Sequence, residues 1–104
     1  MRLLALATAI VHIVLSPAHV APGGAVRLTA THSPCLAVDT ISAISRAFPG
    51  NAFGGEGALT AHVQKGGAFT ITGHVRKALA KGAYTVGFRC GGGNLGTTVT
   101  IRVT

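Results

Sequence analysis

Apolar and polar residues alternate in several short segments of this chain. Val26, Leu28 and Ala30 fall on one face of residues 25–31, and polar residues fall on the other. The same period of two recurs in residues 59–64, 69–75, 84–90 and 99–103. Such alternation is typical of β-strands that bury one face and leave the other in water. The sequence therefore predicts an all-β protein.

Glycine-rich turns separate the alternating segments. The 104 residues include 15 glycines, which gather in turns such as Pro22-Gly23-Gly24, Lys65-Gly66-Gly67 and Gly91-Gly92-Gly93-Asn94. Short strands joined by tight turns are typical of two antiparallel sheets packed face to face, not of alternating strands and helices. A chain of this length forms one domain. We therefore expect an antiparallel β-sandwich of about seven strands.

The segment from Leu36 to Glu56 does not follow this pattern. Its apolar residues between Val38 and Ala47 recur at every third position, as they would on a helix. The β-branched residues and the lack of a capping pattern favour a strand or a loop instead. Strand assignments within this segment therefore stay open.

The amino-terminal segment has the features of an export signal, because a basic start at Arg2 precedes an apolar run and then small residues. Two cleavage sites compete. Cleavage after Ala7-Thr8-Ala9 fits the preferred pattern of small residues and leaves residues 10–104 as the folded domain. Cleavage after Ser16-Pro17-Ala18 is the alternative, and it removes residues 1–18.

The residues that follow Ala9 favour the earlier site. His12 is unusual inside the apolar core of a signal, but in a strand it faces water while Val11 and Ile13 face the core. We therefore expect residues 1–9 to be a signal remnant and Ile10 to Leu15 to be the first strand. Because no apolar stretch approaches the roughly 20 residues that a membrane-spanning helix needs, we expect no integral membrane span.

The order of several motifs resembles a known group of proteins. The chain resembles small secreted immunoglobulin-like domains of high-GC Gram-positive bacteria, of the actinomycete type. The resemblance rests on the stretch "LSPAHVAPGGAVRLTA", followed by a cysteine and then by "GAYTVGFRCGG" and "TTVTIRV". The likeness covers roughly residues 11–104 and is weakest between Leu36 and Glu56. It implies an immunoglobulin-like β-sandwich and an export route. Most members have no known function, so it implies little chemistry.

Cys35 and Cys90 are the only cysteines in the chain. An even number of cysteines in an exported chain predicts one disulfide, because exported proteins fold in oxidising surroundings. Two buried free thiols are the alternative. On the chain-entropy model, closing a loop of this length stabilises the fold by about 4 kcal/mol.

Basic residues far outnumber acidic ones. Nine lysines and arginines against two acids give a formal net charge of +7. One interpretation is that the excess positive charge keeps the protein soluble. The other is that it attracts a polyanion, such as a cell-wall polymer, a membrane surface or nucleic acid. Arg76, Lys77 and Lys81 share one connection, so we expect these three residues and Lys65 to form any anion-binding site. Replacing such loop charges is expected to leave the fold intact.

Nucleic acid is a poor match for these cations. Single-stranded nucleic acid is bound through aromatic side chains interleaved with the positive charge. The chain has only one tyrosine and four phenylalanines and no tryptophan, and most of these rings are needed for the core. Export also favours an anionic cell-envelope polymer, or another extracellular protein, as the partner.

Patterns for catalysis and metal binding are weak. The five histidines do not recur at i, i+2 or i, i+4, and we expect each at a water-facing strand position or in a loop. They are His12, His19, His32, His62 and His74. Asp39 and Glu56 are the only acids, so a catalytic carboxylate pair or a Ser-His-Asp triad would have to use them. We therefore expect no catalytic residues, no metal site and no cofactor.

Together these features predict an exported, non-enzymatic, immunoglobulin-like module of the cell envelope or the extracellular space. An electrostatic binder of anionic polymers is the first alternative. A histidine-based metal-binding domain is the second.

Overall fold

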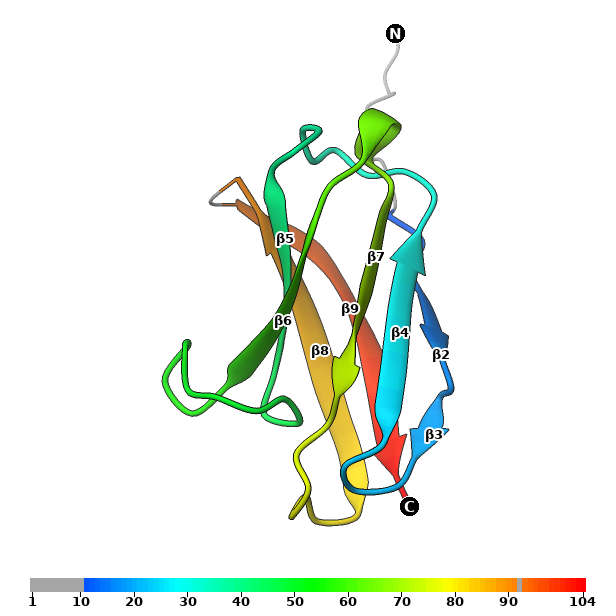
Figure 1. Ribbon diagram of the computed structural model, residues 1–104, viewed down its shortest axis with the longest axis vertical. Coiled ribbons are helices and arrows are strands. Elements are labelled where there is room, and N and C mark those ends of the chain that lie inside the picture. Colours follow the sequence, from blue (N-terminus) through cyan, green and yellow to red (C-terminus); the bar gives the residue numbers. More distant parts are fainter. Residues whose placement is uncertain (1–10, 92) are drawn as a thin grey trace, which may run out of the picture.

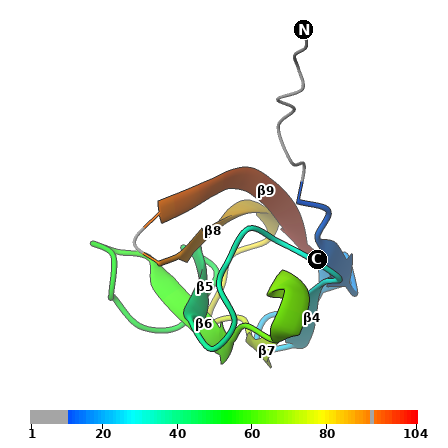
Figure 2. The ribbon, with the colours of Figure 1, turned by 90° about the horizontal axis from the view of Figure 1, so that it is seen from above.

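The computed structural model describes residues 11–91 and 93–104, which form two β-sheets that face each other (Figures 1 and 2). These residues contain strands and one short 3-10 helix, Lys65–Gly67, and no α-helix. The prediction of an all-β protein is therefore confirmed. The expected signal remnant, residues 1–9, lies outside the described residues.

Eight strands lie within the described residues, so the prediction of about seven is too low. One sheet has three strands in the order β2-β4-β7, and the other has five in the order β3-β9-β8-β5-β6. The three-stranded sheet consists of β2 (Val14–Ser16), β4 (Ala25–Ala30) and β7 (Phe69–His74). The five-stranded sheet consists of β3 (His19–Val20), β9 (Gly93–Val103), β8 (Gly82–Cys90), β5 (Thr40–Ser45) and β6 (Gly57–His62).

The chain passes from one sheet to the other between β2 and β3. Ser16 pairs with Arg27 of β4, whereas His19 pairs with Arg102 of β9, and the Ser16–Pro17 peptide bond between them is cis. β3 runs parallel to β9, while the other strand pairs are antiparallel. The prediction of a wholly antiparallel fold is therefore wrong at β3. Its cause is the change of sheet, which brings β3 beside a strand that runs in the same direction.

The first described strand starts later than the predicted strand from Ile10 to Leu15. Val11 is buried and His12 is exposed, as the alternation predicts, but β2 begins only at Val14. Val14 pairs with Thr29, and β4 ends one residue later. In this register Ile13 falls opposite Ala30, the last residue of β4, and residues 11–12 lie beyond the end of that strand, while Ile10 lies outside the described residues.

The segment that the sequence left open contains a central strand. β5 pairs with β6 on one side and with β8 on the other. Ile41, Ala43 and Ser45 are completely buried, and Ile44 is also buried although it points to the opposite face. Burial on both faces obscures the period of two, which explains why the sequence alone did not show a strand here.

The hydrophobic core lies between the two sheets. The predicted inward faces are confirmed for β4, where Val26 and Leu28 are buried, and for β7, where Phe69 and Ile71 are buried. Phe69 and Phe88 face each other across the core, with ring centroids 6.3 Å apart.

Two glycines allow the backbone to approach its neighbours closely. A Cβ at Gly57 would lie 1.9 Å from the carbonyl oxygen of Pro49. The absence of a side chain at Gly57 therefore lets the β5–β6 connection pack against the start of β6. A Cβ at Gly73 would lie 2.5 Å from a methyl carbon of Leu59. Leu59 of the five-stranded sheet therefore packs directly over the backbone of β7.

Candidate functional site

A disulfide joins Cys35 to Cys90, as predicted, and their Cα atoms are 5.9 Å apart. Cys35 lies in the β4–β5 connection, which links the two sheets, and Cys90 is the last residue of β8. Cys35 is buried, and Cys90 packs against the core. The bridge therefore fixes the β4–β5 connection to the five-stranded sheet.

Arg76, one of the four predicted anion-binding residues, has a structural role. Its Nε donates a hydrogen bond to the carbonyl oxygen of Arg46 (2.9 Å), and its Nη2 donates one to the carbonyl oxygen of Gly50 (2.7 Å). Its backbone N–H also donates to the carbonyl oxygen of Ala47 (2.8 Å). Arg76 thus ties the end of β7 to the β5–β6 connection of the opposite sheet. Because these bonds are lost with the guanidinium, we now expect that replacing Arg76 weakens this connection, unlike the replacement of Lys77 or Lys81.

The β7–β8 connection presents the other two predicted cations of this stretch, Lys77 and Lys81, to solvent. The contact between Arg76 and the β5–β6 connection adds an exposed arginine, Arg46, to the same end of the molecule. Nothing in the sequence links Arg46 to the β7–β8 connection, because the two meet only in the folded chain.

Lys65, the fourth predicted residue, lies elsewhere. It precedes β7, whereas Arg76, Lys77 and Lys81 follow it, so the length of that strand separates them. In Figure 1 the Lys65–Gly67 helix and the β7–β8 connection lie at opposite ends of the molecule. The structure therefore brings Arg46, Lys77 and Lys81 to one end, which we call the basic end, and leaves Lys65 at the other.

A depression of about 680 Å³ adjoins the basic end. It is lined by Gly23, Pro49, Gly50, His74, Val75, Arg76, Lys77 and Ala78. Because the Arg76 guanidinium already binds two carbonyl oxygens, Lys77 is the cation of this lining that remains exposed to solvent.

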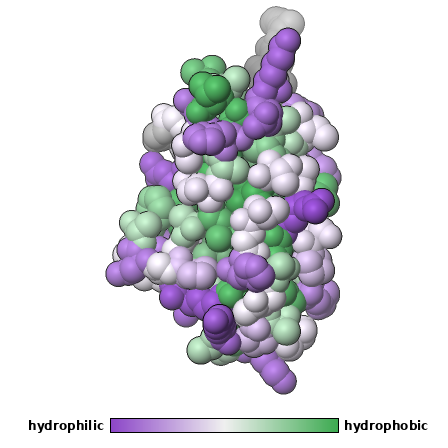
Figure 3. Space-filling model, viewed as in Figure 1, coloured by the Kyte–Doolittle hydropathy of each residue, from purple (hydrophilic) through white to green (hydrophobic). Residues whose placement is uncertain are grey.

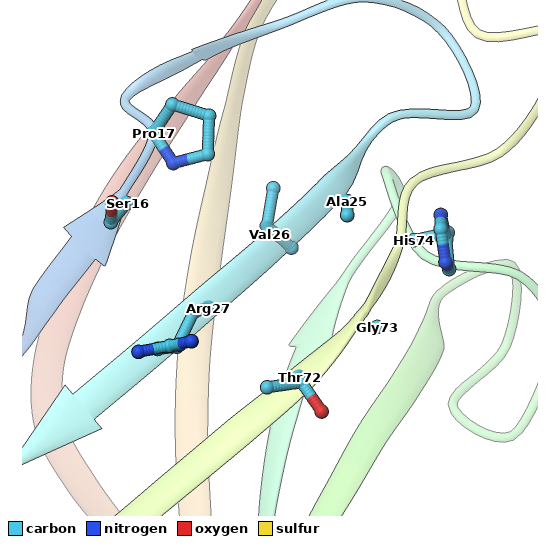
Figure 4. Close-up of a pocket in the computed structure, with 8 residues that line it drawn as sticks. All are labelled: Ser16, Pro17, Ala25, Val26, Arg27, Thr72, Gly73 and His74. Carbon is cyan, nitrogen blue, oxygen red and sulfur yellow. The ribbon is translucent and has the colours of Figure 1, made fainter.

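A second depression, of about 610 Å³, lies over β2, β4 and β7 (Figure 4). Strand pairing places Arg27 between Ser16 and Thr72, and it places His74 opposite Ala25. The Nδ1 of His74 lies 3.1 Å from the carbonyl oxygen of Gly23, which can only accept, so this nitrogen is the donor. No carboxylate lines this depression, so its residues offer no acid–base pair of the kind that His and Asp form.

The histidines and acids are dispersed over the fold. All five histidines are exposed, as the sequence predicts. Asp39 precedes β5 and Glu56 follows it, so that strand separates the two acids. Within residues 11–91 and 93–104, no group of three or more His, Cys, Asp or Glu side chains could hold a metal ion. The same residues include no helix long and apolar enough to cross a membrane.

Comparison with known proteins gives no relative: no family model matches the chain, and no curated protein or solved structure is significantly similar to it.

Proposed function

We propose that this chain is an exported, non-enzymatic module with an immunoglobulin-like β-sandwich fold, acting in the cell envelope or the extracellular space. The Cys35–Cys90 disulfide is the observation that carries the proposal. Disulfides persist in oxidising compartments and are rare where thiols are kept reduced.

Two features support the immunoglobulin-like fold. The two sheets contain three and five strands, and the first part of the chain contributes β2 to the smaller sheet and β3 to the larger one. Immunoglobulin-like domains likewise pack two sheets of similar size face to face. The Tyr84 hydroxyl, near the start of β8, donates a hydrogen bond to the carbonyl oxygen of Ala80 (2.6 Å). Many immunoglobulin domains have a tyrosine that bonds to the backbone a few residues upstream in this way. This chain has no tryptophan, so its core uses Phe69 and Phe88.

Cell fractionation combined with thiol alkylation tests the export proposal. We expect the protein in the envelope or secreted fraction, with Cys35 and Cys90 both protected from alkylation until a reductant is added. Reduced, alkylated protein confined to the cytoplasm would contradict the proposal.

The basic end favours a second candidate function, the binding of anionic polymers. Arg46, Lys77 and Lys81 are exposed at this end, and the chain has only two acids to oppose them. Clustered cations attract polyanions through long-range forces that salt screens.

Retention on a heparin matrix tests this second candidate. We expect Arg46→Gln with Lys77→Gln and Lys81→Gln to elute at clearly lower salt than the wild type, because the variant loses the clustered charge. Arg76 is left in place, since it supports the β5–β6 connection.

A matched control removes three cations that lie outside the β5–β6 and β7–β8 connections: Arg27→Gln, Lys65→Gln and Arg89→Gln. This control has the same net charge and should stay closer to the wild type. Equal losses in the two variants would assign the retention to overall charge and reject a site at the basic end.

A further inference from the structure

An exposed apolar turn stands at the end of the molecule opposite the basic end. Leu36 is 72% exposed and Val38 is 82% exposed, and both belong to the β4–β5 connection. We call residues 36–38 the apolar tip. Hydrophobic surface is visible at this end in Figure 3.

The backbone of the apolar tip is held in a conformation that its sequence disfavours. Val38 has a φ of 66°, a left-handed value that is rare for a β-branched residue. The Asp39 N–H donates to the carbonyl oxygen of Leu36 (3.1 Å), which closes the turn. Glycine or asparagine would adopt this φ more readily than valine. The fold therefore does not explain a valine at this position.

One disulfide and two backbone hydrogen bonds hold the base of the apolar tip in place. Cys35 is bridged to Cys90. The Val38 N–H donates to the carbonyl oxygen of Val63, and the Val63 N–H donates to that of Asp39, both at 2.8 Å. The tip is thus a preorganised projection, and ordering it on binding costs little further entropy.

One lysine, Lys65, lies close to the apolar tip. The Ser33 hydroxyl donates a hydrogen bond to the carbonyl oxygen of Gly67 (2.6 Å), which joins the β4–β5 connection to the helix that carries Lys65. Of the two acids, Asp39 is half-buried at the base of the tip, and Glu56 lies beyond the far end of β5. Lys65 is thus a cation close to the tip, and the net charge of +7 attracts the chain as a whole to an anionic surface.

We propose that the apolar tip docks onto an anionic lipid surface, with Leu36 and Val38 entering the headgroup boundary and Lys65 facing the lipid phosphates. Three residues offer far less than the roughly 1,200–2,000 Å² of a specific protein interface. A fluid lipid surface can enclose a small convex projection, and apolar burial then adds to the attraction of anionic lipids. This inference does not depend on polymer binding at the basic end.

A single tryptophan reports on the contact, because the chain has none of its own. In the full chain, Leu36→Trp should show a blue-shifted emission with vesicles of phosphatidylglycerol and phosphatidylcholine, and little shift with phosphatidylcholine alone. Ala78→Trp, an exposed position in the β7–β8 connection, is the matched control and should not shift. Equal shifts at both positions, equal shifts with both vesicles, or no shift at Leu36→Trp would overturn the proposal.

A second variant, Leu36→Ser with Val38→Asn, tests the apolar contribution by vesicle co-sedimentation. We expect an apparent Kd about tenfold higher, because apolar burial is lost. Its melting temperature should be unchanged or higher, since asparagine tolerates the positive φ. Every variant keeps residues 1–10, so unchanged binding would assign attachment to another part of the chain. Self-association of the wild type that this variant abolishes would assign the tip to a second copy instead. Either result would overturn the proposal.

Discussion

Replacing both cysteines, Cys35→Ala with Cys90→Ala, is expected to lower the free energy of unfolding by about 2–5 kcal/mol. The bridge closes a loop over a sequence separation of 55 and so restricts the unfolded chain. The loss is a large share of the stability of a small domain. Urea titration followed by circular dichroism measures it.

Reduction of the wild type is the control for this prediction. It breaks the bridge but keeps both sulfur atoms in place, so it separates the cross-link from the packing of buried Cys35. We expect most of the loss to appear on reduction alone. A change below about 1 kcal/mol in both experiments would contradict the role given to the bridge.

Removing residues 1–18 is expected to destabilise the domain by about 3 kcal/mol or more relative to removing residues 1–9. The longer truncation deletes buried Val11, the partly buried Ile13 and Leu15, and the whole of β2. It also leaves β4 as an unprotected edge. Differential scanning calorimetry should show a melting temperature lower by roughly 12 °C or more.

The two truncated chains also distinguish the two cleavage sites. Equal melting temperatures would mean that residues 10–18 add nothing to the fold, and would favour cleavage after Ala18. The truncation of residues 1–9 serves as the reference because the described contacts begin at Val11.

The strands that bury one face were predictable from sequence, and those that bury both faces were not. Val26 and Leu28 alternate with polar neighbours in β4, so their period is visible. In β5, Ile44 is buried on the outer side while Ile41 and Ala43 face the core, and the alternation disappears. The change of sheet after Ser16 could not be predicted either, because it depends on which strands lie nearby.

The candidate site was less predictable than the fold. The cysteine count, together with the expectation of export, was enough to predict the Cys35–Cys90 bridge. Proximity in sequence grouped Arg76 with Lys77, but only the folded chain shows that Arg76 binds the carbonyl oxygens of Arg46 and Gly50. The exposure of Val38 at a positive φ likewise follows from contacts with Val63, which no local pattern reveals.

The parallel pairing of β3 with β9 determines how the domain would carry a mechanical load. The Arg102 N–H donates to the carbonyl oxygen of Ala18, and the Thr104 N–H donates to that of Val20, both at 3.0 Å. Tension applied between a point before β2 and a point after β9 pulls these parallel strands in opposite directions, so their hydrogen bonds bear the force together, in shear. The Cys35–Cys90 bridge keeps the segment between the cysteines out of the force path. The extensible parts of the domain are therefore limited to the residues before Cys35 and after Cys90.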